Sequence, residues 1–447
     1  MRIIVNLIFL CFLLSCQKNQ NKNKPNIILI MTDDQGWGQT SYYGHPILNT
    51  PNLDSMAKNG IRFDRFYAGA PVCSPTRASV LTGRANDRTG VPSHGHALRL
   101  QEKTIAQSLK KAGYNTGHFG KWHLNGLRGP GVPIFKNDSH SPGCFGFNYW
   151  LTVTNFFDIN PLMSENGFFK EFKGNSSDII VGEALEFIKR SSTNNHPFFV
   201  VIWDGSPHDP FLASEKDRLQ FKDLDLDSQN HYGELVAFDR SLGHLRNELR
   251  NLGLADNTIL WYCSDNGGLS KVYPSSIGGL RGSKSTIWEG GLRVPAIIEW
   301  PESISPKVTN YPASTMDIFP TIADIVGLPE SDLLSPIDGI SLKSIFNSEI
   351  IDRESFIPFR FNDKGALIDN NYKLVATSLE LEKFELYNLE IDPKESNDIS
   401  NDYPDIFEKM KSAYLIWSES VDLSVNGKDY PEGKVLDNPK SHFWMED

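Results

Sequence analysis

Four short segments of this sequence contain residue types that together could bind a metal ion and an anionic group. Carboxylate and amide oxygens are hard ligands, which suit Ca²⁺ or Mg²⁺ better than Zn²⁺. Lys and His side chains could hold the anion and transfer protons near neutral pH. Each segment alone is also typical of a turn or a helix cap, so only their combination indicates a site. The residues are Asp33 and Asp34, Lys121 and His123, His208, and Asp265 and Asn266.

A fifth segment, Cys-Ser-Pro-Thr-Arg, runs from Cys73 to Arg77. Residues 78–82 after it have a helical composition, and a Pro near a helix start is favourable. Cys73 would then stand at a helix N-terminus, where backbone N–H groups stabilise an anion. A buried Cys before an ordinary helix accounts for the local sequence equally well.

Apolar runs precede the four polar segments, as buried strands would. Their alternation with helical patterns predicts an α/β fold, with a large mixed, mostly parallel sheet sandwiched by helices. Ligands of such sheets bind at the carboxyl ends of the strands, which is where the polar segments fall. The expected strands are residues 27–31, 198–203, 258–263 and, more weakly, 114–119, and the expected helices are residues 104–113 and 232–252.

The chain is long for a single core, and its pattern changes near residue 345. We expect a catalytic domain over residues 26–345 and a smaller C-terminal α+β subdomain over residues 346–447, with a small antiparallel sheet and a helix. Short strands are expected within residues 360–377 and 384–389, and a helix over residues 403–417. The tail from Asp422 onward has no clear period.

The N-terminus predicts export. Residues 1–16 resemble a lipoprotein-type signal peptide, in which Cys16 would be lipidated, and residues 17–25 form a polar tether. A plain secretory signal with an incidental Cys is the alternative. The expected location is the periplasm or the cell surface, with a lipid anchor as the only membrane contact.

The charge balance argues against a nucleic-acid partner. Lys and Arg number 44 against 55 Asp and Glu, a net charge of −11, whereas nucleic-acid binding needs a basic surface. Cys144 and Cys263 could pair in an exported protein, but Cys263 lies in an apolar run and could equally be a buried thiol.

The Cys73 segment, followed by Leu-Thr-Gly-Arg at residues 81–84, resembles the maturation signature of the type I, formylglycine-dependent sulfatases. The resemblance implies an alkaline phosphatase-like fold. It also implies a formylglycine-generating or sulfatase-maturating enzyme as a partner. Five further segments match this family in order: residues 26–36, 120–124, 207–208, 264–268 and 281–295.

This resemblance also implies a role for each site residue. Cys73 would mature to formylglycine, whose hydrated form is the nucleophile, and Arg77 would orient it. The formylglycine oxygen would touch a Ca²⁺ ion, with Mg²⁺ less expected. Asp33, Asp34, Asp265 and Asn266 would be the other metal ligands, Lys121 and Lys284 would contact the sulfate, His208 would lie on the leaving-group side with Lys284 as proton donor, and His123 would be the base.

The substrate implied is a sulfated carbohydrate, with algal polysaccharides such as ulvan or carrageenan as the expected source. His94, His96 and Arg99 are candidates for binding the sugar, although such loop residues are often only surface residues. A phosphodiester or phosphonate hydrolase of the same superfamily is one alternative function. A non-catalytic glycan-binding lipoprotein is another.

Overall fold

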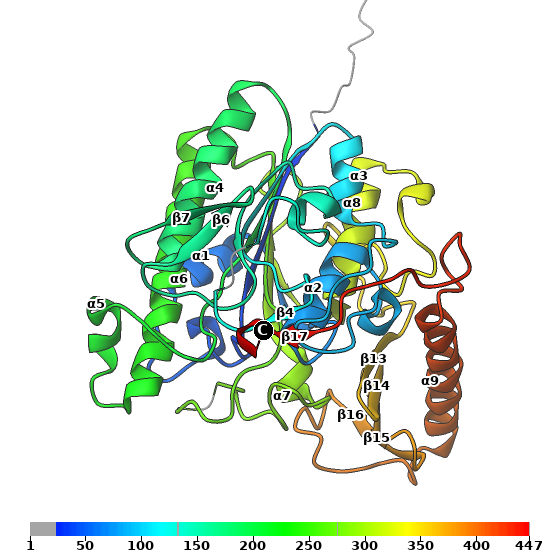
Figure 1. Ribbon diagram of the computed structural model, residues 1–447. Helices are drawn as coiled ribbons and strands as arrows, with labels where there is room; N and C mark the ends of the chain where they lie inside the picture. Colours follow the sequence, from blue (N-terminus) through cyan, green and yellow to red (C-terminus); the bar gives the residue numbers. More distant parts are fainter. Residues whose placement is uncertain (1–23, 132–133, 275, 447) are drawn as a thin grey trace, which may run out of the picture.

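A large mixed sheet forms the centre of the protein (Figure 1). The computed structural model describes residues 24–131, 134–274 and 276–446. The five central strands β9, β1, β8, β3 and β5 are mutually parallel, whereas β10 runs antiparallel to both of its neighbours. In spatial order the strands are β11 (Lys307–Thr309), β2 (Ile61–Tyr67), β10 (Arg293–Glu299), β9 (Thr258–Ser264), β1 (Asn26–Thr32), β8 (Phe198–Trp203), β3 (Asn115–Lys121), β5 (Tyr149–Val153), β6 (Leu162–Glu165) and β7 (Phe168–Glu171), with β12 (Ala313–Ser314) also paired to β2.

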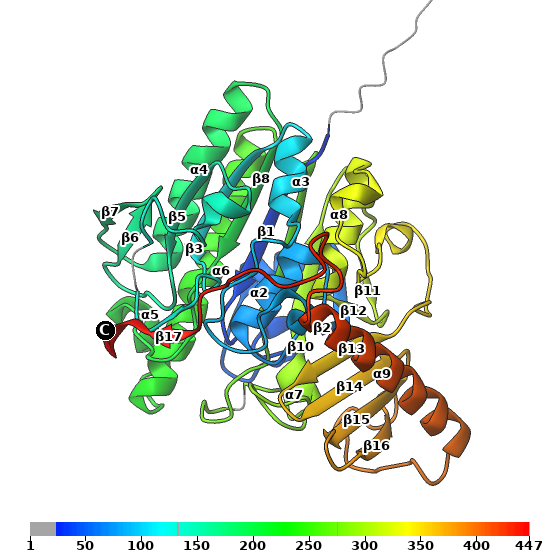
Figure 2. The same ribbon diagram turned by 45° about the vertical axis from the view of Figure 1, so that its right-hand side comes forward.

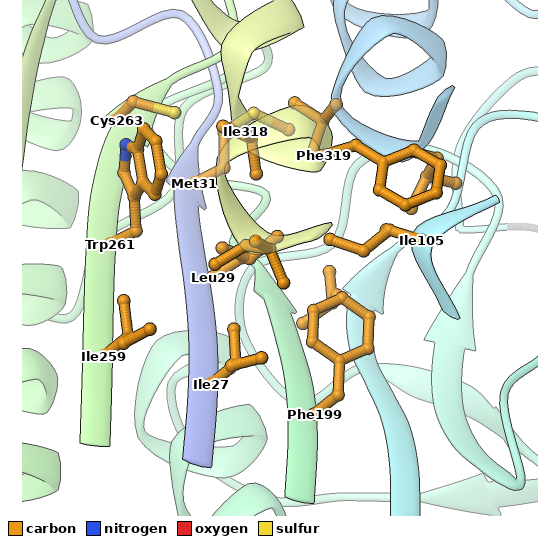
Figure 3. Packing of buried hydrophobic residues seen from close by; sticks show 14 of the residues in the cluster. Ile27, Leu29, Met31, Ile105, Phe199, Ile259, Trp261, Cys263, Ile318 and Phe319 are labelled. Carbon is orange, nitrogen blue, oxygen red and sulfur yellow. The ribbon is translucent and has the colours of Figure 1, made fainter. Parts of the chain in front are cut away.

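Helices cover both faces of this sheet, because β1 is apolar on both sides. Ile27, Leu29 and Met31 pack toward one layer, with Phe199, Trp261 and Phe319 nearby (Figure 3). Ile28 and Ile30 pack toward the other layer. The first layer consists of α2 (Cys73–Thr82), α3 (Ile105–Lys111) and α8 (Ile318–Val326), and the second of α1 (Pro51–Asn59), α4 (Ser176–Thr193) and α6 (Leu226–Asn251), while α5 (Glu215–Arg218) and α7 (Glu289–Leu292) are single turns.

The predicted α/β class and its central strands are confirmed. Each apolar run became a strand within one or two residues of its expected ends. The helix predicted to start at residue 232 begins instead at Leu226, because the Asp225 side chain caps it by accepting from the backbone N–H of Ser228 at 2.9 Å.

The C-terminal part forms a second, antiparallel sheet that α9 (Pro404–Val425) covers (Figure 2). The helix runs eight residues beyond its predicted end. A buried ion cluster joins this sheet to α7, the short helix before β10: Lys373 Nζ lies 3.0 Å from Glu289 and 2.8 Å from Glu395. The strands are β13 (Ile357–Phe361), β14 (Lys364–Asp369), β15 (Tyr372–Ser378) and β16 (Lys383–Asn388).

The tail after α9 returns to the large domain. It crosses the face that carries α2 and ends beside β4 (Leu127–Arg128), with which β17 (His442–Phe443) forms a short parallel pair (Figure 2). The expected signal peptide, including Cys16, and the tether up to residue 23 lie outside the described residues. Within the described ranges, no helix is both long and apolar enough to cross a lipid bilayer.

Candidate active site

Strand pairing brings the predicted acidic residues together. Thr32 at the end of β1 is in register with Ser264 at the end of β9, so Asp33 and Asp265 leave the sheet side by side. The backbone N–H of Asp34 donates to Asp265 Oδ1 at 3.1 Å. All three acids are buried. The parallel register alone therefore builds a carboxylate cluster at this edge of the sheet.

Cys73 is the first residue of α2 and lies against this cluster. It is fully buried, and its Sγ is 3.3 Å from Nδ1 of His123 and 3.4 Å from Nδ1 of His94. His123 follows β3, whereas His94 comes from the loop after α2. The two imidazoles therefore approach residue 73 from separate elements.

Arg77 lies one helical turn after Cys73 and neutralises the acids. One amino group is 2.7 Å from Asp265 Oδ2 and 3.4 Å from Asp33 Oδ2, and the other donates to the Lys121 carbonyl at 3.1 Å. The guanidinium stacks 5.1 Å from the ring centroid of Trp203. Helical spacing thus places Arg77 over the strand ends while Cys73 faces the two histidines.

Two lysines complete the charge balance. Lys121 Nζ bonds to Asp33, and Lys284 Nζ lies 2.7 Å from Asp34. His208 Nε2 is 4.0 Å from Asp34 Oδ2, and its ring stacks on Phe156. Arg77, Lys121 and Lys284 therefore place three positive charges against the three acids.

Burial and neighbouring charges shift the pKa values of these groups. Burial alone would raise the pKa of the Cys73 thiol, but Lys121 and His123 lower it well below its usual range. Burial lowers the pKa of His123 to about 4, so the imidazole is neutral at neutral pH. Burial and the Asp33 charge raise the pKa of Asp265 well above normal. Asp33 and Asp265 can therefore be ionised together only with positive charge close beside them.

The donor atoms fit a hard divalent cation. Ligand atoms of Asp33, Cys73 and Asp265 lie within 4.8 Å of one another. Asp33 Oδ1 and Asn266 Oδ1 are buried, and neither has a hydrogen-bond partner among the described residues. Unpaired buried oxygens are costly, and a cation between them would remove that cost. Asp33, Asp34 and His208 form a second, overlapping group of the same kind.

Backbone strain positions two of these residues. Asp34 has φ 66° and His123 has φ 54°, in the left-handed region that non-Gly residues rarely adopt. Gly267, after Asn266, has no room for a side chain, because a Cβ there would lie 1.9 Å from the Gly290 carbonyl oxygen. The loops at the strand ends are therefore held in a single arrangement by close backbone packing.

The structure brings together every residue predicted for the catalytic and metal sites. Of the three sugar-binding candidates, His94 contacts Cys73 and His96 lies farther out, in a pocket next to it. Arg99 borders the same pocket, but its amino groups donate to backbone carbonyls of residues 88, 424 and 425. Sequence reasoning missed the part that Trp203 plays beneath Arg77, since a Trp at the end of an apolar run gives no sign of a charged partner.

The two cysteines outside the site that the structure describes are free thiols. Cys144 is exposed and Cys263 is buried in β9. Cys263 packs in the core beside Trp261, which matches the buried-thiol interpretation (Figure 3).

Comparison with known proteins identifies the family. A family model described as sulfatase matches residues 25–328, and one described as the C-terminal part of N-sulphoglucosamine sulphohydrolase matches residues 283–416. Residues 417–447 lie outside both matches. The large sheet with its two helical layers is the alkaline phosphatase-like fold. The chain belongs to the sulfatase family and is a sulfuric ester hydrolase.

Individual relatives support this assignment. N-acetylgalactosamine-6-sulfatase of Sus scrofa is 36% identical over 386 residues, covering 78% of this chain and 71% of the relative. Arylsulfatase A of Homo sapiens is 31% identical over 360 residues, covering 72% and 67%. The crystal structure of Ps i-CgsB in complex with k-i-k-neocarrahexaose has a TM-score of 0.78 at 26% identity, covering 88% of this chain and 93% of that one. A phosphonate monoester hydrolase of Agrobacterium radiobacter shares the fold, with a TM-score of 0.63 at 19% identity, covering 93% of this chain and 100% of that one.

Replacing Arg77 by Met should destabilise the protein and inactivate it. The change leaves Asp33 and Asp265 buried with one counter-charge fewer, which should lower the free energy of unfolding by about 3 kcal/mol. Loss of one fixed positive charge should lower kcat about 100-fold or more on 4-nitrophenyl sulfate. Urea denaturation and a colorimetric assay measure the two effects.

Arg62→Met is the matched control, because Arg62 pairs with Asp64 at a partly exposed position. Its free energy of unfolding should change by less than about 1 kcal/mol. Equal behaviour of the two variants would contradict the role given to Arg77.

Proposed function

We propose that the protein hydrolyses sulfate esters through a formylglycine at position 73 and a Ca²⁺ ion bound beside it. The observation that carries this proposal is the position of Cys73, fully buried between two imidazoles and next to a cluster of three acids. A structural cysteine would have no need of these charged neighbours. A hydrated aldehyde at this position would supply a nucleophilic oxygen and a second hydroxyl group.

The chain's own residues then perform binding and proton transfer. Lys121 and Lys284 hold the anionic sulfate, and Arg77 holds the group at position 73 over the acids. His123 is neutral at neutral pH, so it can accept the proton of a hydroxyl group at position 73. His208 is also kept neutral, chiefly by burial, and stands beside Asp34 on the leaving-group side, where Lys284 is the proton donor.

Asp33, Asp34, Asp265 and Asn266 would hold the metal together with the group at position 73. A divalent cation there would stabilise negative charge on the sulfate oxygens. An all-oxygen set favours Ca²⁺. If His208 were a ligand together with Asp33 and Asp34, the site would favour a transition metal instead.

The aldehyde at position 73 can be tested by mass spectrometry. We expect the peptide that contains Cys73, from enzyme produced with a maturating enzyme, to react with a hydrazine reagent. Cys263, the other buried thiol, is the internal control and should remain unmodified. Active enzyme with an intact thiol at position 73 would contradict the mechanism.

The metal can be tested by thermal unfolding. After treatment with a chelator, Ca²⁺ at about 100 times its Kd should stabilise the protein by about 2.7 kcal/mol and restore activity. Asp265→Asn should weaken this response. Greater stabilisation by Zn²⁺ than by Ca²⁺ would contradict an all-oxygen site and point to His208 as a ligand.

For the substrate, we propose a sulfated sugar of the galactose series. One relative is named for N-acetylgalactosamine 6-sulfate, and a solved relative is bound to a neocarrahexaose. Carrageenan oligosaccharides are built from galactose units, so both names describe sugars with the same ring configuration. Ulvan, by contrast, is not built from galactose units.

A screen of defined substrates tests both the reaction and the sugar. Sulfate release is expected from 4-nitrophenyl sulfate and, with higher kcat/KM, from galactose-series oligosaccharides, but not from ulvan oligosaccharides. Cys73→Ser should be folded and inactive. A preference for bis(4-nitrophenyl) phosphate would overturn the sulfatase mechanism in favour of a phosphodiesterase.

We also propose that the protein is exported and anchored at Cys16, in the periplasm or at the cell surface. The support is the sequence of residues 1–16 and the polar tether after it. The maturating enzyme would then act on the chain before or during export.

A further inference from the structure

A basic pocket lies beside the catalytic centre. Its volume is about 520 Å³, and His94 belongs to both places, because it lines the pocket and contacts Cys73. Three permanently charged groups line it, namely Arg99, Arg128 and Lys440, together with His96. None of its lining residues in the described part of the chain is acidic, although the protein carries a net charge of −11.

Arg128 and Lys440 have no acidic partner among the residues that the structure describes. Within the described ranges, no carboxylate lies at ion-pair distance from either side chain. A neighbouring hollow shows the usual arrangement: its Arg360 pairs with Asp87 at 2.6 Å and with Asp422 at 2.7 Å. Cations left unpaired beside a site for an anionic substrate are available to a ligand.

The pocket depends on Gly95, between His94 and His96. Gly95 has φ 63°, and a Cβ there would lie 2.3 Å from Arg128 Cγ. The missing side chain therefore lets Arg128 lie across the loop that carries both histidines. The backbone N–H of Gly95 donates to Ser74 Oγ at 2.8 Å, which ties this loop to the start of α2.

The C-terminal tail forms the opposite wall and is fixed on both sides of Lys440. Asn438 Nδ2 donates to the Ala97 carbonyl at 2.8 Å, and the backbone N–H of His442 donates to the Gly126 carbonyl at 3.1 Å. Ser441 Oγ donates to the His94 carbonyl at 3.3 Å. The tail therefore holds Lys440 at the pocket through bonds to the catalytic domain.

We propose that this pocket binds a second anionic group of the substrate, on the sugar next to the one that carries the reactive sulfate. This inference rests on the proposed function. When the reactive sulfate lies at Cys73, the sugar that carries it lies against His94. The next sugar of the chain then reaches Arg128 and Lys440. Two cations without an acidic partner in the described part of the chain suit a sulfate ester or a carboxylate, so the enzyme selects doubly charged oligosaccharides.

Four substrates with the same reactive sulfate ester test the proposal: a monosaccharide, and disaccharides with a neutral, a sulfated or a uronate neighbour. The ester position is the one that the substrate screen identifies. For the wild-type enzyme, a charged neighbour should raise kcat/KM about tenfold over a neutral one, as two screened contacts would. The sulfated and uronate arms show which anion is preferred.

The double variant Arg128→Ala/Lys440→Ala should bring the ratio for charged over neutral neighbours close to 1. Arg128→Lys and Lys440→Arg should retain it. Lys434→Ala is the matched control, because Lys434 is exposed on the same tail outside the pocket and its loss should leave the ratio unchanged. Added salt should lower the wild-type ratio but not that of the double variant.

A wild-type enzyme that does not distinguish the disaccharides, or a double variant that keeps the preference, would overturn the proposal. Failure of the proposed function would look different, as inactivity on all four substrates. Calorimetry with Cys73→Ser then tests the pocket alone. Binding of the disulfated disaccharide should weaken about tenfold in the triple variant Cys73→Ser/Arg128→Ala/Lys440→Ala, and equal binding would contradict the proposal.

Discussion

The site depends on one electrostatic constraint: two carboxylates forced together by parallel strand register. Asp33 and Asp265 leave neighbouring strands at paired positions and cannot move apart without breaking the sheet. Arg77 reaches both from α2, and Lys121 reaches Asp33 from β3. The helix that carries residue 73 is thereby fixed against the sheet edge by the same charges that a metal ion would share.

The central strands were predictable because a strand buried on both faces must be apolar throughout, which few other segments of this chain are. The predicted site followed from these strands, since their carboxyl ends meet by topology alone. The flanking strands β2, β6 and β7 left no comparable signal: β2 carries charged residues on its half-buried side, and β6 and β7 are partly exposed. Their pairing depends on neighbours that are distant in the sequence.

The tail could not be predicted from sequence for a related reason. β17 has two residues, and its bonds go to Gly126 and β4, more than 300 positions earlier in the chain. The local pattern of apolar and polar residues gives no sign of a contact between segments this far apart in the sequence. For the same reason the sequence assigns no role to Arg128, and it shows no sign that the amino groups of Arg99, a candidate for sugar binding, donate to the last turn of α9 and to the tail's Tyr430.

Because the C-terminal tail folds back onto the catalytic domain, the reactive centre and the neighbouring pocket are built from different segments of the chain. The charged groups around Cys73 come from residues 33–284, whereas one wall of the neighbouring pocket comes from residues 435–441. Reactivity and selectivity can therefore diverge independently among homologues. If the pocket binds the substrate as proposed, changes in the tail would alter which substrates are accepted while the groups around Cys73 stay the same.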